Sequence, residues 1–480
     1  MKRIITTIIL AASVASMLSA QKPNWKNLDV YSVNAETERT EMIFWSKWED
    51  ALSKDFEQSE NYMSLNGTWK FKYHETQQNM DPAIGQTTAA QAQDWADIKV
   101  PGNWEMQGFG IPIYVNTDFE FMTWNPKPPF IPEENPTGVY FRTFEVPQNW
   151  AKRQVYLNLA GAKSGVYVYV NGQEVGYNED SKDLARFNIT KYLVEGTNEL
   201  VLKMYRYSTG SYLECMDFFR ISGIERDVYL SSEKYNTKFD INVVSTLDEA
   251  CKDGLFRLEI SALPTRDLDV SYQLLDKDGE AVLKDCRLVY SGKAMMEGVV
   301  ENVRKWSAET PELYTLLLCV EGEYTRFNVG FRRFEIKGDI FYVNGQPVKF
   351  KGVNLHETDP YTGHYVSRER MLQDLKLMKE HNVNGIRTCH YPQSRMFYDL
   401  CDSLGFYVYL LALLPVALRL RVERDIHGVL ERLRRFDLLH LRFPFLFLVG
   451  RVVPNAPQLN WRGIVAYLYA IAPQSWFTAP

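Results

Sequence analysis

Period-two alternation dominates the chain between residues 45 and 229. In the stretches 155–159 and 166–170, aromatic and β-branched residues recur at the spacing of a β-strand. An Asn-Gly pair follows at 171–172 and is typical of a two-residue hairpin turn. The pattern predicts an antiparallel jelly roll, and we place this domain at residues 21–233.

A second β-rich segment covers residues 236–333. We expect strands at 256–260, 270–275 and 314–320, where apolar and β-branched residues cluster. A length of about 100 residues suits an immunoglobulin-like β-sandwich, which we place at residues 234–334.

The spacing of apolar residues changes from residue 335 onward. A small hairpin is predicted over 341–350, with its turn at Asn344-Gly345, and three short segments are predicted barrel strands: 349–353, 383–388 and 406–409. Two stretches between them have apolar residues at helical spacing: Met371, Leu375 and Met378 in the first, and Phe397, Leu400, Cys401 and Leu404 in the second. Ser367 can cap the start of the first helix, and Gly405 can end the second. This order predicts parallel βα units, the start of a (β/α)₈ TIM barrel at 335–410.

The barrel predicted here is incomplete, because a closed one needs about 250 residues. From residue 411 to 480 the chain has no lysine and nine arginines, unlike the preceding sequence. Its apolar runs at 411–420 and 443–449 are interrupted by Pro415 and Pro444 and are too short to span a membrane. We treat 411–480 as a divergent tail, and our hypothesis is a frame-shifted reading of the gene. Overall we expect a multidomain chain, mostly β and then α/β.

The first 20 residues have the pattern of a signal peptide. Lys2 and Arg3 precede a short apolar stretch, and Ala20 offers a small residue for cleavage. A membrane anchor is the alternative, but polar residues interrupt the stretch, which is shorter than the roughly 20 residues of a span. We therefore expect export to the periplasm or the medium.

Charge and cysteine content narrow the function. A net charge of -6 and a pI near 5.8 make nucleic acid a poor partner and favour a neutral or small polar substrate.

The six cysteines are far apart, with no C-x-x-C pair, so we expect mostly buried free thiols instead of a zinc cluster or a dense disulfide scaffold. They are Cys215, Cys251, Cys286, Cys319, Cys389 and Cys401.

Histidines follow two predicted barrel strands. His356 and His390 lie just past the segments 349–353 and 383–388, at the strand ends where barrel enzymes assemble their sites. A histidine there can hydrogen-bond sugar hydroxyls through either ring nitrogen. The alternative is that Arg387 and His390 only tie one strand to its neighbours. Two histidines at equivalent strand ends favour a site.

These segments resemble glycoside hydrolase family 2, in particular its exported bacterial β-galactosidases. The stretches 384–392 (Asn-Gly-Ile-Arg-Thr-Cys-His-Tyr-Pro) and 402–408 match the family's first signature, and 352–357 looks like its companion motif. The resemblance implies a sugar-binding jelly roll, an immunoglobulin-like sandwich and a TIM barrel. It implies retaining hydrolysis of terminal β-D-galactosides, with His356 and His390 contacting the sugar or supporting the transition state.

Two loops of the first domain extend the resemblance. Residues 108–116 and 211–217 are similar to the family's loops that reach the active site. By that match Asn116 and Asp217 bind galactose hydroxyls, and Asp217 also lies near a monovalent cation, Na in the family. A carboxylate can accept two strong hydrogen bonds from adjacent hydroxyls, although an exposed loop acid is the common alternative. Residues 220–228 resemble galactosidases more than glucuronidases or mannosidases.

Three tryptophans have two interpretations. Trp45, Trp104 and Trp124 could stack on a sugar ring, but core packing is the favoured alternative.

The catalytic carboxyl pair of the family is missing from this sequence. Retaining glycosidases need two such groups about 5 Å apart. The family places Asp-Glu-Ala-Asn and a metal-binding Glu after the third strand, whereas residues 410–415 are Leu-Leu-Ala-Leu-Leu-Pro. Glu423 and Glu431 lie in stretches typical of a charged helix face, and we assign them no catalysis. We therefore expect an inactive chain with an incomplete site for the family's divalent cation, Mg or Ca.

Two alternatives to a β-galactosidase are considered. One is a β-glucuronidase or β-mannosidase of the same family, and the other is a non-catalytic carbohydrate-binding module. The expected partner is a β-galactoside, and a homo-oligomer stays open.

Overall fold

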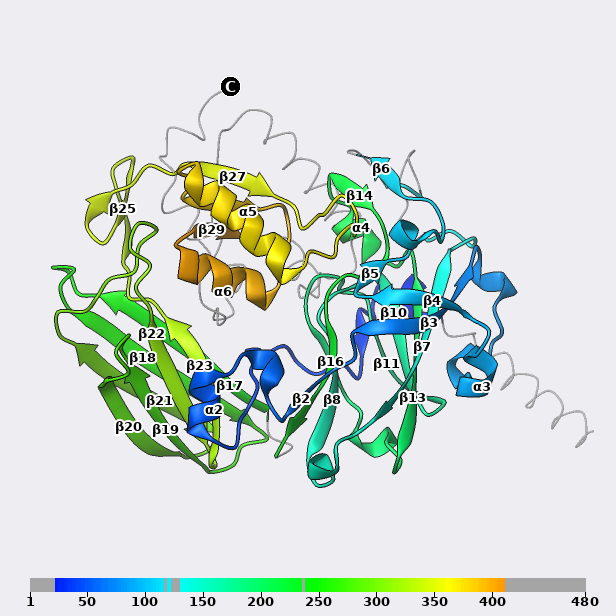
Figure 1. The fold of residues 1–480 in the computed structure, drawn as a ribbon, viewed down its shortest axis with the longest axis horizontal. Coiled ribbons are helices and arrows are strands. Elements are labelled where there is room, and N and C mark those ends of the chain that lie inside the picture. Colours follow the sequence, from blue (N-terminus) through cyan, green and yellow to red (C-terminus); the bar gives the residue numbers. More distant parts are fainter. Residues whose placement is uncertain (1–21, 116–118, 122–129, 235–237, 411–480) are drawn as a thin grey trace, which may run out of the picture.

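Two β-domains and the start of a barrel make up the protein (Figure 1). This computed structural model describes residues 22–115, 119–121, 130–234 and 238–410. In Figure 1 the first domain lies at the right, the second at the lower left, and the barrel segment above and between them. The expected fold class, mostly β followed by α/β, is confirmed.

The first domain is a jelly roll of two main sheets. Its seven-stranded sheet has the order β1-β11-β10-β13-β7-β3-β4, with bounds Ser32–Val33, Gln173–Asn178, Gly165–Val170, Thr197–Tyr205, Thr137–Glu145, Gly67–His74 and Ala96–Val100. Its four-stranded sheet has the order β12-β8-β16-β2, with bounds Ala185–Asn188, Gln154–Leu159, Val228–Glu233 and Tyr62–Ser64. Apolar residues of both sheets form one core. The predicted hairpin joins β10 to β11, and Asn171 and Gly172 both have the positive φ that this turn needs.

Small strands and helices complete this domain. The short strands are β5 (Gly102–Asn103), β15 (Gly223–Ile224) and β9 (Ala162–Lys163) in one sheet, and β6 (Ile113–Val115) and β14 (Phe218–Arg220) in another. The short helices are α2 (Trp48–Ser53), α3 (Ala89–Ala92) and α4 (Ser211–Glu214). Trp45, just before α2, pairs with Tyr324 of the second domain through two backbone hydrogen bonds of 2.8 Å.

The second domain is a sandwich of two antiparallel sheets. One has the order β17-β18-β21, with bounds Lys238–Leu247, Gly254–Leu263 and Lys293–Val300. The other has the order β20-β19-β22-β23, with bounds Ala281–Val289, Leu268–Leu275, Tyr314–Val320 and Glu323–Val329. The inward residues of the two sheets alternate with less buried ones and form a separate core, as in immunoglobulin-like folds.

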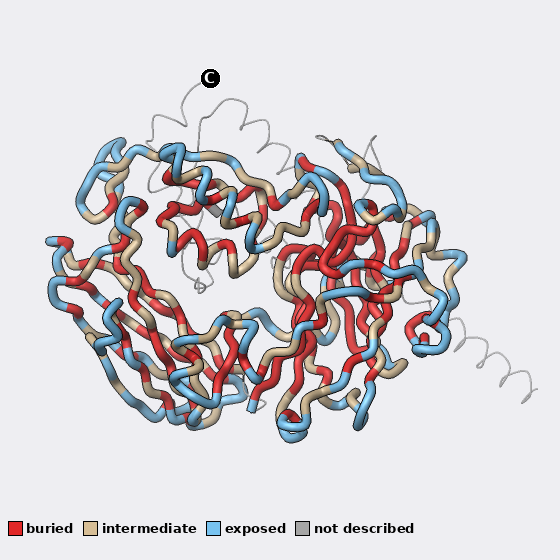
Figure 2. The backbone as a smooth tube through the Cα atoms, in the orientation of Figure 1, coloured by how far each residue is buried: buried red, intermediate tan, exposed pale blue. Residues whose placement is uncertain are grey.

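The third segment begins with a small antiparallel sheet and continues as parallel βα units. The antiparallel strands are β24 (Phe334–Lys337), β25 (Ile340–Val343) and β26 (Gln346–Pro347). The parallel strands are β27 (Gly352–Leu355), β28 (Gly385–Thr388) and β29 (Tyr407–Leu410), joined by α5 (Arg368–Glu380) and α6 (Arg395–Leu404). The parallel sheet and its helices share an apolar core, which Figure 2 shows as buried backbone.

The helix caps predicted for this segment are confirmed. The Ser367 side chain accepts a hydrogen bond from the Arg370 backbone N–H, and Gly405 ends α6 in the left-handed region with φ 77°. The strand predicted at 349–353 is wrong in its bounds, because β27 begins only at Gly352. The hairpin predicted over 341–350 is confirmed, because β25 pairs with β26 and the Val348 N–H donates to the Phe341 carbonyl just beyond them.

The cysteines are free thiols, as expected, but only half of them are fully buried. Cys251, Cys389 and Cys401 are buried, whereas Cys286 is exposed. No helix in the described part of the chain is long and apolar enough to cross a membrane. Residues 1–20 and 411–480, which carry the expected signal peptide and tail, lie outside the described residues.

Candidate functional site

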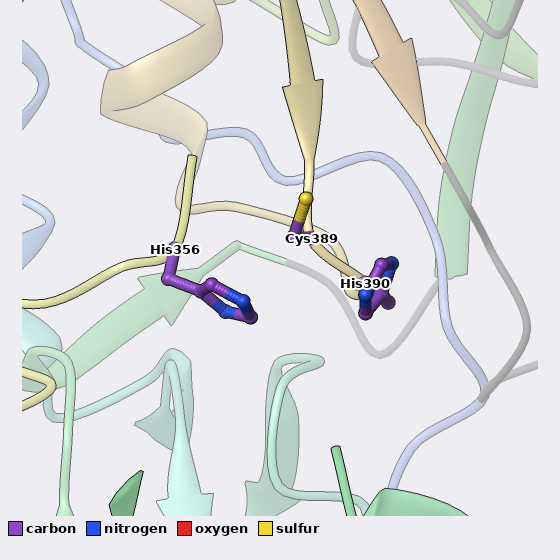
Figure 3. Close-up of side chains that lie close together, drawn as sticks. All are labelled: His356, Cys389 and His390. Carbon is purple, nitrogen blue, oxygen red and sulfur yellow. The ribbon is translucent and has the colours of Figure 1, made fainter. Parts of the chain in front are cut away.

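Parallel pairing brings the two predicted histidines to one edge of the sheet. Leu355 is in register with Thr388, so His356 and His390 both follow the carboxyl ends of their strands. Their ring centroids are 5.9 Å apart and the rings are perpendicular. Figure 3 shows both rings, with Cys389 at the end of β28. The expected position of the histidines is observed, and their contact with a sugar stays a prediction.

Aromatic rings from the first domain and from the barrel segment lie next to His356. Its ring is parallel to that of Phe218, with centroids 5.8 Å apart, and lies 6.1 Å from the ring of Tyr391. Its Nδ1 atom is buried and has no hydrogen-bond partner among the described residues. Burial lowers the pKa of His356 below its ordinary value, although the Asp217 carboxylate opposes this. A neutral imidazole can both donate and accept a hydrogen bond.

Asp217 lies on the loop that reaches this histidine. The loop runs from α4 to β14, and β14 pairs with β6, the strand on the other predicted loop. The Tyr114 hydroxyl donates to Asp217 Oδ1 at 3.1 Å, and the carboxylate is exposed. The two loops singled out from the sequence therefore lie side by side. Asn116 lies outside the described residues.

Arg387 contacts three side chains at the ends of β27 and β28. It donates to Asn354 Oδ1 on β27 at 3.2 Å and contacts Cys389 Sγ at 3.2 Å, while its second amino group lies 3.1 Å from His390 Nδ1. Burial raises the pKa of the Cys389 thiol, against the effect of Arg387. Arg387 does tie two strands together, as the alternative interpretation holds, and it also orients His390.

A buried network of charges attaches the barrel segment to the first domain. Glu357, the residue after His356, accepts hydrogen bonds from Arg226 Nε at 3.0 Å and Nη2 at 2.8 Å, and lies 3.3 Å from Lys182 Nζ. Burial opposes ionisation of Glu357, but Arg226 and Lys182 outweigh it and hold its pKa below the ordinary value. The network thus fixes the backbone beside His356.

The network continues into the first domain through Glu225. This carboxylate pairs with Lys182 Nζ, and its Oε1 lies 3.1 Å from His364 Nδ1. The His364 ring stacks on Phe218 at 4.8 Å. Lys182 and His364 were not singled out from the sequence, since isolated charged residues are usually exposed.

Glu214 anchors the loop that carries Asp217. It is buried in α4 and accepts hydrogen bonds from the backbone N–H and the hydroxyl of Ser181. Burial and the nearby Asp180 carboxylate raise the pKa of Glu214 to about 7. The folded protein therefore holds this proton at a pH where the unfolded chain, with a glutamate pKa of about 4.3, has lost it.

Replacing Glu214 is expected to flatten the pH dependence of stability. Stability from this proton is present below about pH 4.3 and is lost as pH rises toward 7, so Glu214→Gln should stabilise the protein more at pH 7 than at pH 5. Urea unfolding at the two pH values measures this. Glu195→Gln, at an exposed glutamate, is the matched control. An unchanged pH slope in Glu214→Gln would refute the assignment.

The described tryptophans are core residues. Trp45 and Trp104 are 2% and 0% exposed, so core packing is observed and stacking on a sugar is excluded for both. Trp124 lies outside the described residues.

The incomplete site expected for the family's divalent cation stays a prediction, because its motif would follow β29, outside the described residues. Mg²⁺ and Ca²⁺ take oxygen ligands, whereas positions 410–415 supply leucine, alanine and proline side chains. Groups of three or more close His, Cys, Asp or Glu side chains within the described ranges are His356-Cys389-His390 and Glu38-Asp180-Asp183. Asp217 belongs to neither group, so its monovalent cation stays a prediction.

Three family models match the chain in the order of its domains. They are the sugar-binding domain of the glycosyl hydrolases family 2 at residues 62–234, a further family 2 domain at 237–332, and the family 2 TIM barrel domain at 334–411. The chain belongs to glycoside hydrolase family 2. The barrel match ends at the point where the sequence becomes divergent.

Curated relatives of the chain include β-galactosidases. The chain is 37% identical to one from Priestia megaterium over 408 residues, which cover 80% of this chain and 39% of the relative. It is 38% identical to one from Actinobacillus pleuropneumoniae over 360 residues, covering 75% of this chain and 34% of the relative. The chain thus spans less than two fifths of the length of these two relatives.

Solved structures share the fold. A β-glucuronidase from Bifidobacterium dentium superposes with a TM-score of 0.63 at 22% identity, covering 73% of this chain and 61% of that one. A β-glycosidase from Bacteroides vulgatus superposes with a TM-score of 0.59 at 25% identity, covering 72% and 44%.

Proposed function

We propose that this chain is the N-terminal part of an exported β-galactosidase and carries its sugar-contacting residues. The complete enzyme would hydrolyse terminal β-D-galactosides with retention. One observation carries the proposal: His356 and His390 share the carboxyl edge of the parallel sheet, beside the Asp217 loop of the first domain. The curated β-galactosidases support the choice of sugar.

Each residue of the site has a distinct task in this proposal. His356, kept neutral by burial, donates to or accepts from one sugar hydroxyl, and Arg387 holds His390 to contact another. Asp217 accepts hydrogen bonds from adjacent hydroxyls and contributes to a monovalent-cation site. Asn116 is a further proposed sugar contact. The acid/base and nucleophile are absent from the 480-residue sequence, so this polypeptide binds without cleaving.

The proposal is tested by titrating the protein with thio-β-glycosides of galactose, glucuronic acid and mannose. We expect saturable binding with a preference for galactose, because contacts to individual hydroxyls decide the choice of sugar. His356→Ala should weaken binding about tenfold, the effect of losing one well-formed hydrogen bond. His381→Ala, at an exposed histidine beyond α5, should leave binding unchanged.

The β-glucuronidases among the structural neighbours motivate the glucuronide arm of this experiment. Preferential binding of the glucuronide would show that the substrate is a glucuronide and not a galactoside, within the same family. Absence of binding to all three glycosides would overturn the proposed site.

A further inference from the structure

The donor atoms of His356, Cys389 and His390 form a compact group at the carboxyl edge of the parallel sheet. One nitrogen or sulfur atom from each residue lies within 4.8 Å of the others. Figure 3 shows the three side chains, which come from the ends of β27 and β28. We propose that they form a binding site for a transition-metal dication of the zinc class, with a fourth position open.

The chemistry of the donors selects this class of ion. Two imidazoles and one thiolate are typical ligands of Zn²⁺, whereas Mg²⁺ and Ca²⁺ require oxygen atoms. Zinc bond lengths of about 2.0–2.3 Å place tetrahedral ligand atoms about 3.3–3.8 Å apart. Side-chain rotations that bring the donors about 1 Å closer would therefore complete the site.

One feature of the surroundings favours a metal site and another opposes it. The buried Nδ1 of His356 has no hydrogen-bond partner among the described residues, so a metal ion would satisfy a polar atom that is otherwise uncompensated. Arg387 contacts Cys389 Sγ at 3.2 Å and His390 Nδ1 at 3.1 Å, and because a guanidinium only donates hydrogen bonds, it must release His390 Nδ1 when the ion binds.

The charge of Arg387 is the main cost of binding a dication here. The thiolate that Cys389 provides carries one compensating negative charge. Asp217 provides a second, since its carboxylate acts on the His356 ring. Together these two negative charges offset all but one of the three positive charges of the metal and the guanidinium.

A bound ion would occupy the same histidines that are proposed to contact sugar, which makes zinc an expected competitor of the glycoside. The metal site itself rests on the three donors and not on the identity of the sugar. Its test therefore needs no glycoside, and it can succeed or fail independently of the proposed function.

The experiment titrates the reduced, tag-free 480-residue chain with Co²⁺ and Zn²⁺. We expect one ion per chain and, with Co²⁺, the near-ultraviolet charge-transfer absorption of a cobalt–thiolate bond. Cys389→Ser should abolish this absorption and weaken Zn²⁺ binding at least tenfold. Cys286→Ser, at the exposed cysteine of β20, should leave both unchanged.

A second variant keeps the test independent of folding effects at Cys389. His390→Gln retains the thiol and should also weaken Zn²⁺ binding at least tenfold, with circular dichroism unchanged. Absence of the cobalt–thiolate absorption, or its persistence in Cys389→Ser, would overturn the proposal.

Discussion

The 480-residue polypeptide is expected to hydrolyse a chromogenic β-galactoside no faster than the buffer does. Retention requires a carboxyl acid/base and a carboxylate nucleophile about 5 Å apart, and residues 411–480 contain neither family motif. Enzymes accelerate reactions by at least about 10⁶-fold, so loss of both groups should remove activity by at least that factor. The measurement is the release of nitrophenol by purified protein from a host without its own β-galactosidase.

The matched control is a chain in which the reading frame after the Tyr409 codon has been corrected. If the frame-shift hypothesis is right, one of the other two frames encodes a sequence like Asp-Glu-Ala-Asn, and the corrected chain hydrolyses the substrate. Hydrolytic activity that copurifies with the uncorrected polypeptide would contradict the expected inactivity. So would the absence of that motif from both other frames.

Replacing Glu357 by alanine is expected to destabilise the protein by about 3–5 kcal/mol, the range measured when one partner of a buried ion pair is removed. Glu357 is 3% exposed and pairs with both Arg226 and Lys182, so its loss leaves two buried cations with less compensation. Urea unfolding followed by tryptophan fluorescence measures the change.

Two further variants separate charge pairing from other effects at this position. Arg226→Met combined with Glu357→Leu removes both charges and should recover much of the lost stability. Glu259→Gln breaks a surface pair with Arg257, in which both side chains are about 40% exposed, and should change stability by less than about 1 kcal/mol. A loss below 1 kcal/mol in Glu357→Ala would show that the network does not hold the barrel segment in place.

The strand ends of the site could be predicted from the sequence because periodicity and caps are local properties. Ser367 and Gly405 mark where helices begin and end, so the histidines could be placed just after strands. The start of the first barrel strand could not be predicted from the same signals. Phe350 packs in the cluster of Phe341 and Tyr407, and apolar spacing alone does not distinguish that hairpin from β27.

The charged network behind the site is a product of tertiary packing. Lys182 and Glu225 are far apart in the chain and meet through the fold of the first domain, and Glu357 joins them only because that domain packs on the barrel segment. Local patterns carry no signal for such a meeting, and a lone lysine or glutamate is almost always solvated. The His356-Cys389-His390 group could not be predicted from cysteine spacing for the same reason, because its members come from two strands that are separate in the sequence.

Galactoside binding by the intact chain, compared with a chain cut after Glu335, tests the central claim most directly. The account places the sugar between the Asp217 loop of the first domain and the histidines of the barrel segment, so it predicts saturable binding by the intact chain and none after the cut. Binding that persists in the cut chain would contradict the account. It would instead identify the two β-domains as a carbohydrate-binding module.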